Sequence, residues 1–399
     1  MTDEISAEDW LQQAVIASNQ GLHPQAREAF SRALSIDPTL GEAMLGLGLS
    51  HMATRDFGDA VMPLRQAAAT PDAPAIWHAC LAQGLYMTGD FSGCAEAFER
   101  AAALEPLATN ARLTHARART FASMIQGSVD DALARYPALA GDEAEDIEVI
   151  AREAFAILGV FGHAPAAAAV GAWRLARSPD DQIQAYLLQA VSGAAVDRAP
   201  AAYVEAHFDS FAENFDHQLV DLLNYRAPER MAQLIEDHAG QFAEILDLGC
   251  GTGLSAPALA RFGGRLTGVD LSGGMLDRAR ARGGYDLLVQ AEAVAFLDQH
   301  PAALDLVFAA DMVIYFGDLS DLFRAAGKAL RPGGFFTLST EVGAEGWTLL
   351  SSGRFSHADD YVAQAAGPEF ALLDQEPIAL RHEGTAPVRG TLHVFQRSA

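Results

Sequence analysis

The chain is long enough for two or three domains, and its charge argues against a nucleic-acid-binding protein. Its 399 residues are 50% hydrophobic and include 27 Lys and Arg against 52 Asp and Glu, a net charge of −25. Proteins that bind nucleic acid cluster Lys and Arg to neutralise phosphates, and this sequence has no basic stripe. We therefore expect no nucleic-acid partner and a solvated, acidic surface.

The cysteines and the N-terminal residues indicate a cytoplasmic protein. Cys80, Cys94 and Cys250 are isolated in the sequence, so we expect neither a disulfide framework nor a metal site. The first ten residues are acidic and polar, unlike those of a signal peptide. No uncharged apolar run reaches the roughly 18 residues that a membrane span needs. A membrane partner is therefore not expected.

Residues 1–108 have an internal period of 34 residues. In each unit small residues recur at the same positions, a large apolar residue stands between them, and a proline-containing segment closes the unit. Small side chains at helical spacing allow paired helices to approach closely. The pattern resembles the tetratricopeptide repeat, which implies stacked helical pairs that bind a peptide or a protein. The recurring positions are Ala14, Gly48 and Ala82; Ala26, Ala60 and Cys94; Phe30, Leu64 and Phe98; and Ala33, Ala67 and Ala101.

Residues 109–200 keep the helical pattern but lose the 34-residue register. Apolar residues still recur at helical spacing, as at Ile147, Ile150 and Ala154. Terminal repeats are atypical because one of their faces meets solvent instead of a neighbour. We therefore expect additional helical repeats, a cap and a linker in this region.

Residues 201–399 are predicted to form a second domain of alternating strands and helices. Its first segment is rich in Tyr and Phe and could either belong to the core or cover a ligand. Alternating strands and helices predict right-handed crossovers and a parallel sheet, with the ligand beyond the carboxyl ends of the strands. Strands are expected at 244–248, 265–270, 286–290, 304–309 and 334–341, followed by a C-terminal hairpin.

The first of these strands ends in a glycine-rich turn, D-x-G-x-G-x-G, which contains Asp247, Gly249, Gly251 and Gly253. Glycine adopts positive φ readily and lets a ligand approach the backbone, and N–H groups at the start of the next helix are expected to face that ligand. A dinucleotide-binding turn would have a glycine in place of Leu254, which disfavours a nicotinamide oxidoreductase. A carboxylate at Asp247 would repel phosphate but suits an ammonium or sulfonium group.

The turn strongly resembles motif I of class I S-adenosylmethionine-dependent methyltransferases. The next strand ends in Asp270, and the family uses an acid there to accept the ribose hydroxyls. The resemblance covers residues 203–399 and implies a Rossmann-like, seven-stranded sheet with an antiparallel final strand, S-adenosyl-L-methionine as cofactor and S-adenosyl-L-homocysteine as product. The cofactor-binding residues it implies are Tyr203, Phe211, Asp247, Gly249, Cys250, Gly251, Gly253, Asp270, Leu271, Met275, Ala291, Glu292, Ala310 and Asp311.

Two functions remain open at this stage. The whole chain resembles predicted bacterial methyltransferases that carry tetratricopeptide repeats, which implies methyl transfer to a protein or peptide recruited by the repeats, or to a small molecule. The alternative is a scaffold whose methyltransferase fold only senses cofactor. The sequence assigns no catalytic residue, although several side chains could act as a base or assist one: Asp311, Tyr315, His357, His382, Tyr203 and His207.

Overall fold

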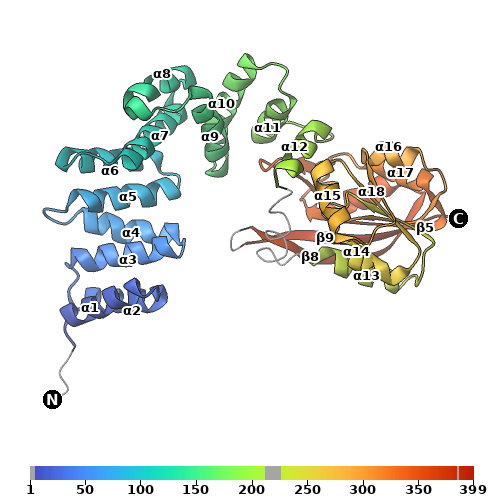
Figure 1. Ribbon diagram of the computed structural model, residues 1–399, viewed down its shortest axis with the longest axis horizontal. Coiled ribbons are helices and arrows are strands. Elements are labelled where there is room, and N and C mark those ends of the chain that lie inside the picture. Colours follow the sequence, from blue (N-terminus) through green and yellow to red (C-terminus); the bar gives the residue numbers. More distant parts are fainter. Residues whose placement is uncertain (1–4, 212–225, 384–385) are drawn as a thin grey trace. The chain divides into compact units, whose positions relative to one another are not determined.

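The computed structural model describes residues 5–211, 226–383 and 386–399, with side chains described outside 210–225 and 382–386. The chain divides after Pro179 into two compact units, which are described separately below (Figure 1). The segment 109–200, predicted as additional repeats and a linker, spans this boundary. None of the described helices is long and apolar enough to cross a membrane.

The first unit begins with three pairs of neighbouring helices. The first helix of each pair starts at residue 7, 41 or 75 and the second at residue 23, 57 or 91, so successive pairs are 34 residues apart. The 34-residue period predicted from the sequence is therefore the period of the helical pairs. The pairs are α1 (Ala7–Asn19) with α2 (His23–Ile36), α3 (Gly41–Ala53) with α4 (Phe57–Ala68), and α5 (Ala75–Met87) with α6 (Phe91–Leu104).

The recurring small residues lie where the two helices of a pair pack together. Ala26, Ala60 and Cys94 are each fully buried. At Gly48 of α3, an added Cβ would lie 2.5 Å from a side-chain carbon of Leu64 on α4. The small residues are thus needed because a larger side chain would push the paired helices apart.

We expect Gly48→Ala to destabilise the first unit by about 1–3 kcal/mol, because the added methyl group overlaps Leu64. Gly58→Ala is a matched control, since Gly58 lies in α4 and its added Cβ meets nothing within 4 Å. The control should be neutral or slightly stabilising, because alanine favours helix. Calorimetric unfolding of both variants tests this, and equal transition temperatures would contradict the packing argument.

Helices continue to pair up to residue 177, but the 34-residue register is lost between residues 109 and 177. Helix α7 starts at residue 109, again 34 residues after α5, but it has 18 residues where α5 has 13. The next helix therefore starts late, which explains why the sequence columns fail after this point. The remaining elements of the unit are α7 (Thr109–Gln126), α8 (Val129–Ala140), η1 (Gly141–Glu143), α9 (Ile147–Val160) and α10 (Ala164–Arg177).

The second unit is built on a largely parallel sheet, which has nine strands among the described residues. Its main path is β3-β2-β1-β4-β5-β9-β8, and β9 runs antiparallel to both of its neighbours. The predicted strands and the antiparallel C-terminal hairpin are confirmed. The strands on this path are β1 (Glu244–Leu248), β2 (Arg265–Asp270), β3 (Leu287–Gln290), β4 (Leu304–Ala309), β5 (Leu330–Val342), β8 (Phe370–Glu383) and β9 (Ala386–Arg397).

Two details of the predicted sheet region were wrong. The count of seven strands misses β6 (Trp347–Leu349) and β7 (Phe355–His357), a short pair that continues the sheet because β5 extends past the end of β4. The helix expected at 253–262, after the glycine-rich turn, is instead a four-residue helix, α14 (Ala256–Leu259), followed by a short 3-10 turn, η3 (Ala260–Phe262). The turn itself occupies the residues before Ala256.

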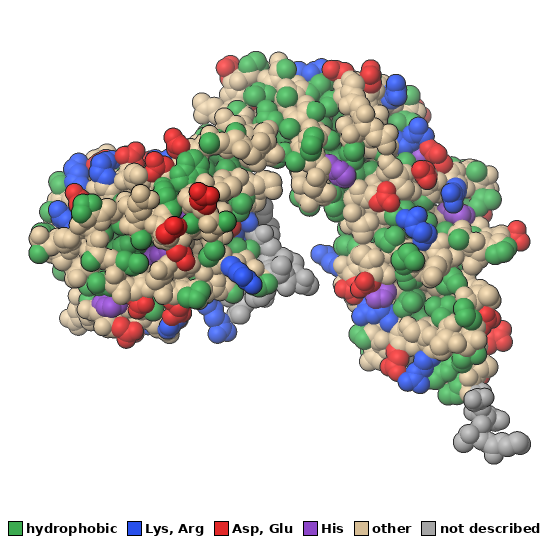
Figure 2. Space-filling view, turned by 180° about the vertical axis from the view of Figure 1, so that it is seen from behind, with side chains coloured by type: hydrophobic (Ala, Val, Ile, Leu, Met, Phe, Trp, Pro, Cys, Tyr) green, Lys and Arg blue, Asp and Glu red, His purple; other side chains and the backbone are tan. Residues whose placement is uncertain are grey.

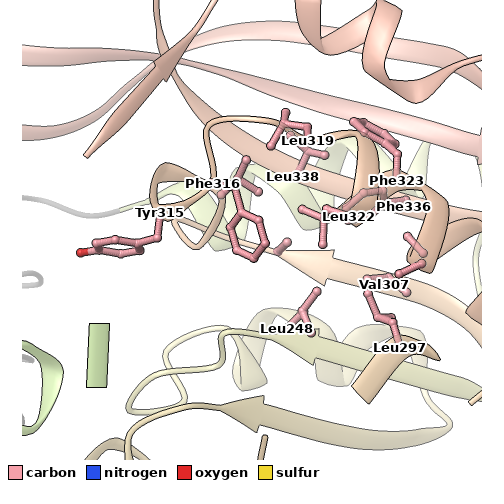
Figure 3. Close-up of a cluster of buried hydrophobic side chains, with 14 of the residues drawn as sticks. Leu248, Leu297, Val307, Tyr315, Phe316, Leu319, Leu322, Phe323, Phe336 and Leu338 are labelled. Carbon is pink, nitrogen blue, oxygen red and sulfur yellow. The ribbon is translucent and has the colours of Figure 1, made fainter. Parts of the chain in front are cut away.

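Helices cover both faces of this sheet (Figure 1). On one face, side chains such as Leu248 and Val307 from the strands pack against Leu322 and Phe323 of α17 (Figure 3). This cluster also includes residues of α11, α12, α16 and α18, while α13 and α14 pack on the other face. The helices are α11 (Gln182–Ser192), α12 (Ala201–Phe211), α13 (Ala227–Glu236), α15 (Gly273–Arg282), α16 (Ala293–Asp298), η4 (Val313–Tyr315), α17 (Ser320–Ala329) and α18 (Asp359–Ala366).

The visible surface carries acidic, basic and hydrophobic side chains in mixture. On the face shown in Figure 2, Lys and Arg side chains lie among Asp and Glu and among apolar side chains. Many charged side chains of the described residues are paired, as Arg324 is with Asp298 at 2.9 Å. This arrangement fits the solvated surface that the composition predicts.

Candidate functional site

A cavity of about 510 Å³ lies at the carboxyl ends of β1, β2 and β4. This is the edge at which open parallel sheets bind their ligands. The lining includes the glycine-rich turn after β1, Asp270 at the end of β2 and Leu271 after it. The lining also includes residues of α12, of η4 and of the segment before η4, and two arginines, Arg354 and Arg381.

The glycine-rich turn has a backbone that only glycine adopts easily. The φ angles are 73° at Gly249, 53° at Gly251 and 86° at Gly253, all in the left-handed region that a Cβ disfavours. At Gly249 a Cβ would also lie 2.5 Å from Met312. At Gly251, which lines the cavity, it would meet nothing within 4 Å and would project into open space.

Four N–H groups of this turn donate within the protein, so they are not available to the ligand that they were expected to face. The N–H groups of Gly249 and Cys250 both donate to the carbonyl of Val269, at 2.7 and 3.0 Å. The N–H of Gly253 donates to the carbonyl of Cys250 at 2.9 Å. The N–H of Gly251 donates to a side chain, the Asp270 carboxylate. The turn is therefore held in place by its own hydrogen bonds and by β2.

Asp270 joins the turn to the start of α15. Its Oδ2 accepts the Gly251 N–H at 2.8 Å and its Oδ1 accepts the Ser272 N–H at 2.9 Å. Burial raises the pKa of Asp270, and these two backbone donors oppose that effect. Each carboxylate oxygen has a second lone pair, so Asp270 can still accept hydrogen bonds from hydroxyl groups in the cavity.

Asp247 lies beneath the turn and is not among the residues that line the cavity. Its side chain is 1% exposed, and its Oδ2 accepts a hydrogen bond of 2.6 Å from the hydroxyl of Tyr285. Its Oδ1 has no hydrogen-bond partner within 3.5 Å among the described residues. Burial raises the pKa of Asp247 to about 7, and the hydrogen bond from Tyr285 opposes that rise. The carboxyl group is therefore partly protonated near neutral pH.

This buried carboxyl should make the stability of the second unit depend on pH. A rise of the pKa of Asp247 from 3.8 to about 7 means that its contribution is complete below about pH 4 and is lost as the pH rises through about 7. Asp247→Asn should remove this pH-dependent loss of stability, which amounts to up to about 4 kcal/mol in the free energy of unfolding. We expect the variant to unfold at a higher temperature than the parent at pH 8, with the difference vanishing near pH 4. A difference that is the same at both pH values would contradict this assignment.

Glu292 has a structural role at the edge of the cavity. Its carboxylate oxygens accept the N–H groups of Val294 and Ala295, at 3.0 and 2.8 Å, and so cap the start of α16. The same carboxylate pairs with Arg198, whose guanidinium lies 4.1 Å from the ring centroid of Phe316. Glu292 is thus held in place at the cavity wall.

A buried network of charges surrounds Asp311, the second residue after β4. Arg381 of β8 pairs with Glu341 of β5 and lies 3.5 Å from the Asp311 carboxylate. Arg354 donates from Nε to the same Glu341 at 2.9 Å. Asp311 has a left-handed φ of 53°, rare for a residue other than glycine, and its N–H donates to the Ser339 hydroxyl at 2.8 Å. The network fixes two cations and one carboxylate at the cavity.

Aromatic rings form a further part of the cavity lining. Phe208 of α12 meets Tyr315 of η4 edge to face, with ring centroids 5.5 Å apart. His207 stacks on Tyr203 at 5.7 Å, and Tyr203 in turn packs on Tyr186 of α11. Figure 3 shows Tyr315 apart from the tightly packed leucine and phenylalanine side chains, with its hydroxyl pointing away from them. Such rings suit an apolar or planar group.

The structure brings most of the predicted cofactor-binding residues to one cavity. Tyr203, Asp247, Gly253 and Met275 are not among the lining residues: the first two and Met275 are buried, and Gly253 supports the turn. Phe211 ends α12, and its side chain lies outside the described residues. The predicted residues that line the cavity are Gly249, Cys250, Gly251, Asp270, Leu271, Ala291, Glu292, Ala310 and Asp311.

Some of the candidate bases also line the cavity, and others do not. Asp311, Tyr315 and His207 line the cavity. His357 is fully buried in β7 at 3.2 Å from the carbonyl oxygen of Gly317, away from the cavity lining. The side chain of His382 lies outside the described residues. Sequence reasoning missed Arg198, Arg354 and Arg381, for which no motif gives a signal.

Comparison with known proteins identifies the class of this unit. Residues 246–338 match the family described as "Methyltransferase domain". The ubiquinone biosynthesis O-methyltransferase of Idiomarina loihiensis is 39% identical over 124 residues, 29% of this chain and 50% of that protein. The enzyme of the same name from Sodalis glossinidius is 32% identical over 123 residues, 30% and 49% of the two chains. The chain thus spans about half the length of the curated relatives it matches.

Solved structures with a related fold have low sequence identity. The N-methyltransferase NodS of Bradyrhizobium japonicum, solved with S-adenosyl-L-homocysteine, is 18% identical, with a TM-score of 0.40 over 49% of this chain and 99% of its own. The family match over residues 246–338 shows a class I S-adenosylmethionine-dependent methyltransferase domain, whose methyl donor is S-adenosyl-L-methionine.

Proposed function

We propose that the chain transfers a methyl group from S-adenosyl-L-methionine to an oxygen atom of a small organic molecule. The observation that carries the proposal is the lining of the cavity, which combines the glycine-rich turn and Asp270 with aromatic rings and titratable groups. The named relatives, which are O-methyltransferases, favour oxygen as the acceptor atom.

The glycine-rich turn and the residues at the end of β2 fit the methyl donor. Asp270 would accept the ribose hydroxyls, and the absence of a side chain at Gly251 leaves room for the amino-acid part of the cofactor. Leu271 and Ala291, which both line the cavity, would contact the adenine. Asp247, buried below the turn, would act on the cationic cofactor through its charge alone.

The cofactor supplies an activated methyl group, so the protein's main contribution is alignment of the acceptor. Phe208 and Tyr315 would hold a planar acceptor, and Asp311 and Arg354 line the same cavity. The cavity walls would also exclude water from the reacting atoms.

For the first unit we propose a tetratricopeptide-like recruiting role. The helical pairs repeat every 34 residues, with small residues at the contacts between paired helices, and stacked pairs of this kind present extended surfaces to peptides or proteins. A recruited protein could be the acceptor itself or could carry it. A scaffold whose second unit only senses cofactor remains the alternative.

One experiment separates these possibilities. The pure full-length protein is incubated with S-adenosyl-L-methionine labelled in its methyl group and with cell lysate, which is then separated into macromolecules and small molecules. Label in an ether of a small molecule is the expected result. Label in a protein would place the acceptor among recruited partners. Binding of S-adenosyl-L-homocysteine without label transfer to either fraction would favour the scaffold.

A further inference from the structure

We propose that Asp209 holds helix α12 across the glycine-rich turn, and that this attachment sets the rates at which the cofactor enters and leaves the cavity. The inference rests on the proposed function, because it takes the cofactor to lie on that turn. Its basis is the path of α12 between two fixed ends, together with the hydrogen bonds that Asp209 forms at the second of them.

The segment that leads into α12 is tied to the chain that follows β4. The N–H of Ala199 donates to the carbonyl of Tyr315 at 3.0 Å, and the N–H of Gly317 donates to the carbonyl of Asp197 at 2.8 Å. These bonds belong to a short antiparallel bridge between the two segments. The beginning of α12 is therefore fixed beside η4, on the β4 side of the cavity.

The other end of α12 is held by the carboxylate of Asp209. Its Oδ1 accepts a hydrogen bond of 2.5 Å from the hydroxyl of Ser272 and a longer one, of 3.3 Å, from the N–H of Gly274. Ser272 is fully buried and caps α15, where its Oγ accepts the N–H of Met275. A carboxylate is favoured at the start of a helix, where N–H groups lack helical partners. The two bonds of Asp209 thus attach α12 to α15, against which it lies (Figure 1).

Between these two ends α12 crosses the end of β1. In the sheet β1 lies between β2 and β4, and α15 follows β2 as η4 follows β4. A helix tied to both must span two strand spacings, roughly 10 Å. With 11 residues, α12 is about 16 Å long, which is sufficient. Three of its side chains at helical spacing line the cavity beside the glycine-rich turn: Ala201, Val204 and Phe208.

The attachment is also joined to the carboxylate proposed to hold the ribose. The N–H of Ser272 donates to Oδ1 of Asp270, and Oδ2 of Asp270 accepts the N–H of Gly251. A chain of hydrogen bonds therefore runs from α12 to the glycine-rich turn, and all of its members are protein groups. Since the ligand is not one of them, loss of the attachment should loosen α12 equally in free and in bound protein. Such a change alters the rates of exchange and leaves the affinity nearly constant.

The test measures both rates by surface plasmon resonance on the immobilised full-length protein, with S-adenosyl-L-homocysteine as the probe. Asp209→Ala removes the attachment, and alanine favours helix, so α12 should persist. We expect the association and dissociation rate constants each to rise about tenfold, which corresponds to about 1.4 kcal/mol. The affinity should stay within about threefold of the parent's, whereas simple damage to the cavity would lower it.

Glu205→Ala is the matched control, because it removes the same charge from the exposed side of α12 one turn earlier. The contact of Glu205 with Gln290, at 3.5 Å, is at the limit of a hydrogen bond. Both rate constants should stay within about twofold of the parent's. An equal acceleration in Glu205→Ala and Asp209→Ala would show an effect of charge and overturn the proposal.

Ser272→Ala identifies the partner through which Asp209 acts. This variant should also exchange the ligand faster, and the double variant should be at most about twofold faster than the faster single variant, because both substitutions remove the same hydrogen bond. Two effects that multiply would overturn the proposal, as would rates for Asp209→Ala equal to the parent's. Failure of the parent protein to bind S-adenosyl-L-homocysteine would count against the proposed function instead.

Discussion

Gly251→Ala should abolish measurable binding of S-adenosyl-L-homocysteine, a loss of at least about 100-fold or roughly 3 kcal/mol. The substitution combines a strained backbone, since φ is 53°, with a methyl group placed in the open space at the cavity wall. Strain alone costs about 1–2 kcal/mol. The remainder of the effect comes from overlap with the ligand. Isothermal titration calorimetry measures it directly.

Gly263→Ala separates the two contributions. Gly263 also has a left-handed φ, 64°, and an added Cβ there meets nothing within 4 Å, but it lies in the exposed turn after η3. This control should lower the unfolding temperature slightly and leave the affinity unchanged. If both alanine variants bound the ligand as the parent does, the glycine-rich turn would not be the cofactor site.

Asp270→Ala should lower the affinity for S-adenosyl-L-homocysteine by about 10- to 100-fold. Hydrogen bonds to a charged group contribute about 1.5–3 kcal/mol, and this substitution removes the carboxylate that would hold the ribose. It also removes the acceptor of the Gly251 and Ser272 N–H groups, so the turn should lose order as well. Titration calorimetry gives the affinity, and circular dichroism shows whether the fold persists.

Asp277→Ala is the control for charge. Asp277 lies on α15, a few residues from Asp270, but its side chain is 79% exposed. Its removal should leave affinity unchanged. Asp270→Asn keeps the shape of the side chain and removes its charge, so an affinity between those of the parent and of Asp270→Ala is expected. Equal affinities for Asp270→Ala and Asp277→Ala would remove Asp270 from the cofactor site.

Local patterns in the sequence were sufficient for most of the sheet. Each strand from β1 to β4 is a short, mainly apolar segment next to glycine or a charged residue, and the order of strands and helices determines a parallel sheet. The pair β6 and β7 could not be predicted in this way, because each strand has three residues and forms only where β5 extends beyond β4.

The residues proposed to bind the methyl donor were largely predictable because they lie at the ends of consecutive strands, as Gly251 follows β1 and Asp270 ends β2. The charge network could not be predicted from the sequence alone. Arg354 and Arg381 meet Glu341 only because the loop before β7 and the strand β8 converge on the end of β5. The burial of Asp247 likewise depends on Tyr285, 38 residues away.

The hydrogen bonds within the glycine-rich turn have a consequence for the kinetics of ligand binding. Since the N–H groups of Gly249, Cys250 and Gly253 already have backbone partners and that of Gly251 has Asp270, the turn is preorganised. Binding of a ligand to the turn therefore does not include the entropic cost of ordering a loop. Association at this wall should therefore follow a single exponential whose rate rises linearly with ligand concentration, without the plateau that a slow rearrangement of the turn would impose.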